Sequence, residues 1–265
     1  MLSVGGRRLL AAVMAVGLLV VYLPLAVVLV NSFNSSRTFG WPPRHLTLHW
    51  WSQAWQSAGA RSALRSSVEA GLGATAIALL LGTMAAFAVS RYRWFGRDTV
   101  SFLLLLPIAL PGIVTGIALN NAFHVAGTSF GLLTIIIGHS TFCIVLVFNN
   151  AVARLRRMGG TLEEASMDLG AGVFQTFRFV TLPLLRSALL AGALLAFALS
   201  FDEIIVTTFT ASPGVQTLPL WIFANLFRPN QAPVVNVVAA ALIVLSVLPV
   251  WLAQRVSGEP VGARH

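Results

Sequence analysis

Long apolar stretches separated by short polar segments dominate the hydrophobicity pattern of the chain. Several of them reach the roughly 20 residues that a helix needs to cross a hydrocarbon core about 30 Å thick. Because lipid leaves an isolated strand without hydrogen-bond partners, each stretch is predicted to be a helix. The pattern therefore predicts an all-α polytopic membrane protein with six transmembrane helices in a single domain, residues 1–265. The predicted spans are residues 9–31, 64–90, 100–126, 130–152, 188–210 and 233–256.

Two other interpretations of the apolar stretches are weaker. The strands of a membrane β-barrel would alternate polar and apolar residues over about 10 positions, whereas these stretches are apolar on every face. The first stretch follows Arg7 and Arg8, as in a signal peptide, but it is longer than the usual apolar region of one. No small-x-small cleavage site precedes the polar segment 31–34, so residues 9–31 are expected to remain as an anchor.

The composition supports the membrane assignment. Of 265 residues, 57% are apolar and 9% are charged, whereas roughly a quarter of a soluble domain is charged. Lipid is therefore the expected solvent for most of the chain. The single Cys143 falls within the fourth predicted span, and we interpret it as a small buried apolar residue.

All 17 basic residues are arginines, and their distribution among the loops predicts the orientation of the chain. Basic residues near helix ends are retained on the cytoplasmic side of a membrane. A cytoplasmic N-terminus puts twelve arginines inside and five outside, which favours both termini in the cytoplasm. The net charge of +9 is then mainly a topology signal, with anionic lipid headgroups as neighbours. Nucleic-acid binding is disfavoured because the arginines form no continuous basic face. The twelve are Arg7, Arg8, Arg91, Arg93, Arg97, Arg154, Arg156, Arg157, Arg178, Arg186, Arg255 and Arg264, and the five are Arg37, Arg44, Arg61, Arg65 and Arg228.

The longest cytoplasmic connection, residues 153–187, exceeds what a simple link between two spans requires. Within it, Thr161 and Glu164 have the spacing of a capping box, in which Thr161 caps a helix and Glu164 reaches back to the Thr161 amide. Gly170 is expected to end this short exposed helix in a left-handed conformation. A second helix is predicted to begin near Val173 and to lead into the fifth span.

Two prolines, Pro107 and Pro111, lie one helical turn apart in the third predicted span. Each removes a backbone donor and is expected to kink the helix. A membrane tolerates such a bend where the freed carbonyls face protein or a water-filled cavity, which would suit a helix that lines a pore. Ordinary packing of Gly112 and Gly116 against a neighbouring helix is an equally good interpretation.

A stretch of the cytoplasmic connection 153–187 resembles a family motif, the EAA loop of bacterial binding-protein-dependent ABC importer permeases. The motif reads EAA-x3-G-x9-I-x-L-P, and the chain matches its spacing at every step. Ser166 and Val180 replace an alanine and the isoleucine of the pattern, and both are mild departures. The matching residues are Glu164, Ala165, Ser166, Gly170, Val180, Leu182 and Pro183.

Other segments resemble the spermidine/putrescine-type branch of this family, and the likeness covers nearly the whole chain. The resemblance implies a type I importer permease fold in a bacterial inner (cytoplasmic) membrane. It also implies cytoplasmic ATPase subunits, a second permease subunit that differs from this chain, and an extracytoplasmic solute-binding protein as partners. The implied solute is a polyamine such as putrescine or spermidine, with other small solutes as alternatives. The segments are residues 31–34, 91–93, 139–143, 168–171 and 200–203.

The resemblance further implies a role in ATPase coupling for Glu164, Ala165, Gly170, Leu182 and Pro183. In such importers the EAA helix sits in a groove of the ATPase and transmits its closure to the spans. The small side chain of Ala165 would permit close approach, and a capped helix would transmit displacement rigidly. The alternative is that Glu164 only caps its own helix, since capping boxes are common.

No motor is expected in the chain itself. A phosphate-binding P-loop needs a lysine in G-x4-G-K-[ST], and the sequence contains no lysine. The chain is therefore predicted not to be an enzyme and to need no cofactor, with ATP hydrolysed by a separate subunit.

Two carboxylates, Asp202 and Glu203, lie about fourteen residues into the fifth predicted span. A carboxylate inside a bilayer costs about 2.5 kcal/mol or more unless it faces water or a cation. Adjacent helical positions point about 100° apart, so only one of the two is expected to face the translocation path. We predict that Asp202, with Glu203 as a second candidate, receives a cationic solute. The alternative is a structural pair with a partner subunit, or a protonated carboxyl.

The remaining polar residues give little support to rival functions. Arg65 and Glu69, four residues apart, are expected to form an ion pair. The histidines have no metal-ligand spacing. A secondary transporter or channel subunit is the main rival class, but the sequence has no visible inverted repeat or self-contained ion site. An intramembrane enzyme is disfavoured because no nucleophile and base pair is apparent.

Overall fold

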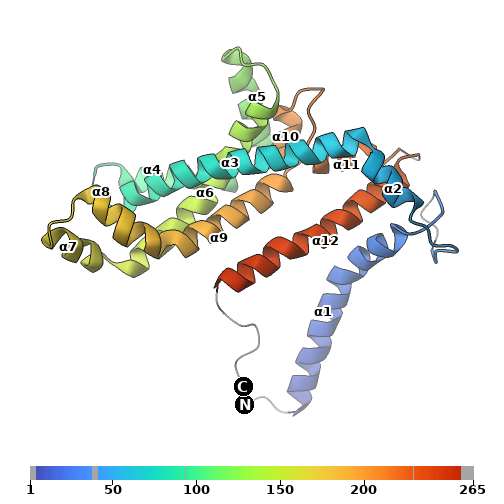
Figure 1. Ribbon diagram of the computed structural model, residues 1–265, viewed down its shortest axis with the longest axis horizontal. Coiled ribbons are helices and arrows are strands. Elements are labelled where there is room, and N and C mark those ends of the chain that lie inside the picture. The colour runs from blue at the N-terminus through green and yellow to red at the C-terminus, as the bar shows by residue number, and fades with distance from the viewer. Residues whose placement is uncertain (1–3, 38–40, 93, 229, 258–265) are drawn as a thin grey trace. The chain divides into compact units, whose positions relative to one another are not determined.

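The computed structural model describes residues 4–37, 41–92, 94–228 and 230–257, with side chains from residue 5 to residue 246 within those ranges. Arg93, Arg264 and the side chain of Arg255 therefore lie outside the description. Helices joined by turns and short loops make up the described residues (Figure 1). The only strand-like pairing among them is an isolated antiparallel bridge between Asn34 and Leu46. The predicted all-α class is confirmed.

The first compact unit is Met1–Arg61 with Trp221–Val250. It contains α1 (Val4–Asn31), α2 (His49–Gln56) and most of α12 (Ala232–Ser257). None of the most apolar window of α1 is buried. The indole nitrogen of the buried Trp50 donates a hydrogen bond of 3.0 Å to the carbonyl of Asn34, which fixes α2 to the segment that follows α1.

The second compact unit is Ser62–Leu220 with Trp251–His265. Its centre is α6, which packs against α3 and α9, and these three helices run side by side in Figure 1. The short helix α10 packs against both α5 and α6. Its elements are α3 (Ala58–Arg91, which begins in the first unit), α4 (Arg97–Ala109), α5 (Gly112–Val125), α6 (Leu132–Met158), α7 (Thr161–Asp168), α8 (Val173–Thr176), the π-helix η1 (Phe177–Thr181), α9 (Leu182–Phe201), α10 (Ile205–Thr210) and the start of α11 (Leu218–Asn225).

Four helices among the described residues are long and apolar enough to cross a membrane: α1, α3, α6 and the continuous helix Val173–Phe201. The pair α4 and α5 meets the same test only if both helices are counted as one span, which would make five. In α12 the apolar segment within the described side chains is shorter, Ala232–Ser246. The described residues therefore contain four of the six predicted spans, or five if α4 and α5 are counted as one.

The third predicted span, residues 100–126, is not one helix. It is broken into α4 and α5, whose axes differ by 106°. Leu110 leaves the helical region, with φ −81° and ψ 144°, because the ring of the following Pro111 disfavours the α conformation before it. Pro107 lies inside α4 without ending it. The predicted bend is confirmed, and Pro111 is the residue that produces it.

The fifth predicted span, residues 188–210, also differs from its prediction. The helix extends further toward the N-terminus, through η1 and α8, and it ends at Phe201. Residues 202–204 are not helical, and α10 begins at Ile205. No proline or glycine lies at this break, so the sequence carried no local signal for it.

Small residues let the central helices approach closely. A Cβ placed at Gly82 of α3 would lie 2.9 Å from the carbonyl oxygen of Ile144, and one at Gly192 of α9 would lie 3.2 Å from the Cα of Val147. Glycines of two helices thus contact the backbone of α6 in the same region. In lipid, association of this kind depends on close packing rather than on the hydrophobic effect. Buried alanines line the same contacts at Ala74, Ala78, Ala86 and Ala196.

We expect Gly82→Ala to lower the free energy of unfolding by about 1–3 kcal/mol, because the added methyl group meets backbone atoms that cannot move aside. Denaturant unfolding of the purified chain in detergent would measure this. The matched control is Gly17→Ala on α1, where a Cβ would meet nothing within 4 Å. Equal unfolding midpoints for Gly82→Ala and the native chain would contradict the close contact between α3 and α6.

Candidate functional site

The predicted exposed helix of the 153–187 loop is α7, but it begins differently from the prediction. Its N-cap is Gly160, and no side chain forms a cap hydrogen bond. Thr161 is the first helical residue, so the predicted capping box of Thr161 and Glu164 is wrong. The positive φ of Gly159, +65°, turns the chain one step earlier than a Thr161 cap would require.

The end of α7 follows the prediction. Gly170 has a φ of +90°, in the left-handed region that favours glycine. Its amide donates to the carbonyl of Met167 at 2.8 Å, and the amide of Ala171 donates to the carbonyl of Ser166 at 3.1 Å. These two bonds are those of a Schellman motif, which satisfies carbonyls that a helix end leaves free. The predicted left-handed stop at Gly170 is confirmed.

Glu163, which the sequence did not single out, makes the strongest polar contact of α7. Its carboxylate accepts two hydrogen bonds from Arg91 at the end of α3, Nε to Oε2 at 2.6 Å and Nη2 to Oε1 at 3.2 Å. The same guanidinium donates to the carbonyl of Gly159 at 2.7 Å and to that of Leu155 at 3.4 Å. Only 20% of the Arg91 side chain and 13% of the Glu163 side chain are exposed. The sequence pattern had drawn attention to the neighbouring Glu164 instead.

Two hydroxyl contacts join α7 to the helix that leads into the membrane. The hydroxyl of Thr181, the last residue of η1, donates to Glu163 Oε1 at 2.8 Å. Ser166 and the buried Thr176 share a hydrogen bond of 3.1 Å between their hydroxyls. π-Helical turns are rare and occur often at functional sites. Here the π turn places Thr181 against the carboxylate of Glu163.

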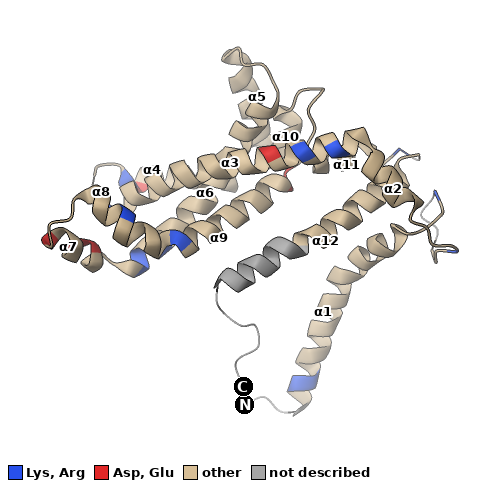
Figure 2. Cartoon of the chain, in the orientation of Figure 1, with Lys and Arg blue, Asp and Glu red and all other residues tan. Residues whose placement is uncertain are grey.

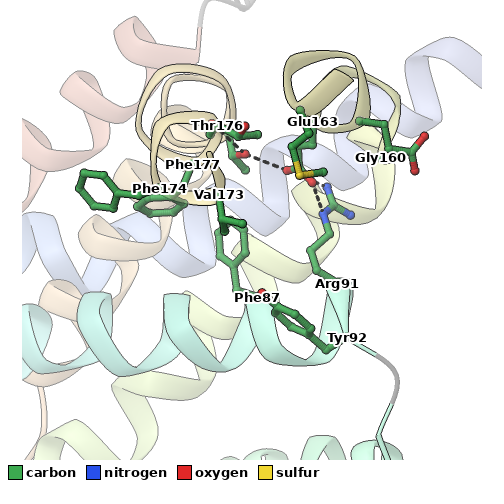
Figure 3. Close-up of a pocket in the computed structure, with 12 residues that line it drawn as sticks. Phe87, Arg91, Tyr92, Gly160, Glu163, Val173, Phe174, Thr176 and Phe177 are labelled. Carbon is green, nitrogen blue, oxygen red and sulfur yellow. Dashed lines mark hydrogen bonds and ion pairs between the residues drawn. The ribbon is translucent and has the colours of Figure 1, made fainter. Parts of the chain in front are cut away.

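A groove of about 720 Å³ lies between α7, the end of α3 and α8. Figure 3 shows its aromatic lining, with Phe87 and Phe177 in edge-to-face contact at 5.2 Å. The Arg91–Glu163 pair crosses the groove at one side, and Phe174 on α8 is largely exposed. This end of the unit therefore presents apolar surface to its surroundings. Its exposed apolar side chains include Leu162, Met167, Leu169, Val173, Phe174 and Phe179.

The predicted coupling residues fall into two groups. Glu164 and Ala165 lie on the exposed surface of α7, and the Glu164 carboxylate makes no hydrogen bond or ion pair with any described residue. Gly170 ends that helix. Leu182 and Pro183 lie instead at the start of α9, directly after the π turn.

Charged residues gather at the end of the second unit that carries α7. Arginines on α4, α6, η1 and α9 lie around the acidic residues of α7 (Figure 2). One of them, Arg154, donates from Nε to the carbonyl of Leu184 at 3.0 Å. By the positive-inside rule this arginine-rich end is predicted to be cytoplasmic, and the orientation stays a prediction.

The break after α9 is held by a buried histidine. His139 of α6 is fully buried, and its Nδ1 lies 2.7 Å from the hydroxyl of Ser200 on α9. Its Nε2 lies 2.9 Å from the hydroxyl of Thr207 on α10. Because the hydroxyl of Thr207 donates to the carbonyl of Glu203 at 2.8 Å, we assign the ring proton to Nε2. His139 thus binds both helices that flank the break.

The two predicted path carboxylates have different surroundings. Glu203 Oε1 accepts a hydrogen bond of 2.8 Å from the amide of Val206, so Glu203 caps the start of α10. Asp202 is exposed at the end of α9; its amide donates to the carbonyl of Ala198 at 3.2 Å, and its carboxylate makes no hydrogen bond or ion pair with any described residue. The expectation that both lie on one continuous helix, 100° apart, is wrong. Of the two carboxylates, that of Glu203 is bound through one oxygen to the chain, whereas that of Asp202 makes no such bond within the described residues.

Other polar residues of the membrane helices serve packing. Asn120 Nδ2 of α5 donates to the carbonyl of Phe209 at 2.7 Å, which ties α5 to α10. The predicted ion pair between Arg65 and Glu69 is present, with Nε and Oε1 2.7 Å apart. Among the described residues, no group of three or more His, Cys, Asp or Glu side chains could hold a metal ion.

Comparisons with known proteins agree with this architecture. The sequence profile of the family described as "Binding-protein-dependent transport system inner membrane component" matches residues 78–258. The chain is 33% identical over 254 residues to the spermidine/putrescine transport system permease protein PotC of Escherichia coli (strain K12), covering 96% of each chain. It is 32% identical to the putrescine transport system permease protein PotI of the same strain, over 87% of this chain and 84% of PotI.

A third relative carries a different name. The chain is 32% identical over 262 residues to the putative 2-aminoethylphosphonate transport system permease protein PhnV of Salmonella choleraesuis (strain SC-B67), covering 94% of this chain and 97% of PhnV.

Solved structures share the fold. A chain of a bacterial ABC transporter involved in the import of the acidic polysaccharide alginate aligns with a TM-score of 0.71 at 18% identity, covering 97% of this chain and 98% of that one. A chain of the MetNI methionine ABC transporter, in an inward-facing conformation, aligns with a TM-score of 0.57 at 21% identity over 75% of this chain and 92% of that one.

We expect His139→Leu to lower the free energy of unfolding by about 1–3 kcal/mol, because the substitution leaves the buried hydroxyls of Ser200 and Thr207 without their shared partner. Denaturant unfolding in detergent would measure the change. His124→Leu is the matched control, since His124 is exposed and its substitution should stay within about 0.5 kcal/mol. Equal stability of the two variants would contradict the role of His139 at the break.

Proposed function

Because the chain belongs to the family of binding-protein-dependent transport system inner membrane components, we propose that it forms half of the translocation path for a small cationic solute and couples that path to a separate ATPase through α7. Members of this family are multi-pass inner-membrane permease subunits of ABC importers, and they are not enzymes. Their partners are in general ATPase subunits, a further permease and a solute-binding protein. For this chain we propose a second permease of different sequence.

The exposed surface of α7 is the observation that supports the coupling role. Apart from Glu163 and Ser166 its side chains are exposed, and the carboxylate of Glu164 makes no hydrogen bond or ion pair within the described part of the chain. The small side chain of the neighbouring Ala165 would let a partner protein approach the helix closely, and exposed apolar residues surround both positions. A patch of this kind is typical of a surface that another protein covers. We assign that partner as the ATPase, which puts α7 and both termini in the cytoplasm.

The position of Asp202 supports the proposal of a cationic solute. α9 is 20 residues long, about 30 Å at 1.5 Å per residue, so Asp202 lies at the far end of that helix from α7. Its carboxylate stands at a helix C-terminus, where the helix dipole also favours positive charge. The relatives PotC and PotI carry spermidine and putrescine in their names, and both molecules are cationic amines at neutral pH. A polyamine is therefore the favoured solute.

A second candidate solute is 2-aminoethylphosphonate, which the name of the relative PhnV suggests. It shares the ammonium group of a polyamine but adds an anionic phosphonate. Competition would separate the two, since excess spermidine should block uptake of labelled putrescine whereas 2-aminoethylphosphonate should not. Uptake of labelled 2-aminoethylphosphonate without uptake of labelled putrescine would favour the phosphonate.

For the coupling role, we expect Glu164→Ala to weaken co-purification of the ATPase subunit from detergent-solubilised membranes and to lower uptake about tenfold, a loss of about 1.4 kcal/mol of coupling. Glu69→Ala is the matched control, because Glu69 pairs on the same chain with Arg65, far along α3 from α7. Normal ATPase recovery and uptake with Glu164→Ala would refute the assignment of α7.

For the solute site, we expect Asp202→Asn to lower uptake of labelled putrescine about tenfold in cells that lack the native chain, because one charge contact is lost. The ATPase should still co-purify. Asp98→Asn is the matched control, since Asp98 is exposed and pairs with Arg97 at the start of α4. Unchanged uptake in an assembled Asp202→Asn importer would remove Asp202 from the path.

A further inference from the structure

We propose that the partly buried ion pair of Arg91 and Glu163, with Thr181, is the latch that transmits displacement of α7 to the membrane helices. This inference rests on the proposed coupling role of α7 and assigns its positioning residues. Neither Arg91 nor Glu163 is needed to contact the ATPase, because both side chains are largely buried within this chain.

The backbone around α7 cannot transmit a displacement in a fixed direction. Gly159 and Gly160 precede the helix, and Gly170 and Gly172 follow it. A Cβ at Gly159 or at Gly170 would meet no atom within 4 Å, so side-chain packing holds neither turn, and the hydrogen bond from Arg91 to the Gly159 carbonyl belongs to the proposed latch. Glycine has the greatest backbone freedom of any residue, and both connections of α7 therefore act as hinges.

Packing cannot transmit the displacement either. No apolar side chain of α7 is buried, and the groove of about 720 Å³ lies between α7, the end of α3 and α8, so α7 packs mainly against η1 and part of α8. Within the described residues, side-chain hydrogen bonds join α7 to the membrane helices at two points. One is the contact of Ser166 with Thr176, and the other is the cluster at Glu163. Only the second includes charged groups.

The geometry of the Glu163 cluster suits a mechanical connection. Both carboxylate oxygens are bound, one by Arg91 alone and one by Arg91 and Thr181 together. Arg91 also holds the carbonyls of Leu155 and Gly159, at the end of α6. A bidentate guanidinium fixes direction as well as distance, which a single hydrogen bond does not. The Glu163 carboxylate thus joins α7 to the end of α3, where Figure 3 shows it against Arg91, and to Thr181 at the end of η1, and Arg91 extends the connection to the end of α6.

The test uses the assembled importer in proteoliposomes, with its ATPase, partner permease and binding protein. Uptake of labelled putrescine, spermidine and 2-aminoethylphosphonate is measured together with ATP hydrolysis. Glu163→Gln keeps the size of the side chain and removes its charge. We expect the ATPase to stay bound and the ATP hydrolysed per solute to rise about tenfold, within the usual range of coupling free energies.

Further variants separate a latch from a residue that only supports the loop. Arg91→Lys keeps the charge but loses the bidentate geometry of the guanidinium. It should therefore raise the ATP hydrolysed per solute less than Glu163→Gln does. In the double variant, Arg91→Lys should raise the ATP hydrolysed per solute little beyond the value for Glu163→Gln alone, because both changes break the same connection. Glu69→Gln, at the exposed ion pair, is the matched control and should leave the ratio unchanged. Additive effects of Arg91→Lys and Glu163→Gln would overturn the latch.

A distance measurement gives a readout that needs no solute. In a Cys143→Ser background, spin labels at Leu169 beside α7 and at the exposed Leu80 of α3 report whether the two helices move together. In the importer with Glu163 intact, we expect the distance between the two spin labels to be the same with and without vanadate-trapped ATPase. With Glu163→Gln, we expect trapping to shift or broaden this distance. An unshifted distance in the trapped Glu163→Gln importer would overturn the inference.

The outcomes also separate this inference from the proposed function. A native chain that fails to bind the ATPase refutes the coupling role of α7 itself. A Glu163→Gln chain that binds the ATPase and couples normally refutes only the latch. Loss of ATPase binding in Glu163→Gln would overturn the latch as well, because Glu163 would then serve docking.

Discussion

Backbone amides and carbonyls inside a bilayer find no water, so the protein must supply partners wherever a helix stops. The two breaks in the second unit meet this requirement in different ways. At Leu110 and Pro111 the proline has no amide to satisfy, and Leu110 still donates to the carbonyl of Leu106 at 3.0 Å. At residues 202–204 side chains supply the bonds, with the Glu203 carboxylate on the amide of Val206 and Thr207 on the carbonyl of Glu203. The second solution leaves Asp202 exposed beside a stable break.

Two kinds of contact hold the second unit together, each suited to its surroundings. Between the membrane helices, glycines and alanines allow backbones to approach, since lipid gives no hydrophobic driving force for helix association. Around α7 the contacts are polar and few, and the ion pair of Arg91 and Glu163 is partly sheltered from water. The packed helices are therefore suited to move as bodies. α7 can change its position without disturbing any buried apolar side chain.

The sequence predicted the apolar spans, the left-handed stop at Gly170 and the bend near Pro111 because each depends on local chemistry. It could not predict the break at residues 202–204, which contains no proline or glycine and depends on His139 from another helix. The sequence also could not show which of Glu163 and Glu164 pairs with Arg91. Two adjacent glutamates fit the same pattern, and only the position of Arg91, 72 residues earlier, decides which one is buried. The predicted capping box failed because the glycine pair 159–160 turned the chain first.

The π turn of η1 gives the nine-residue spacing between Gly170 and Val180 a geometric meaning. An α-helix advances by about 100° per residue, so a single inserted or deleted residue changes the rotational phase of all that follows. A π turn holds more residues in one turn than an α turn does. Phe177–Thr181 therefore sets the phase of α9 relative to α7, and the phase in which Thr181 meets Glu163 also determines which face of α9 carries Asp202. The length of this segment is then as much a part of the transport machinery as the identity of its residues.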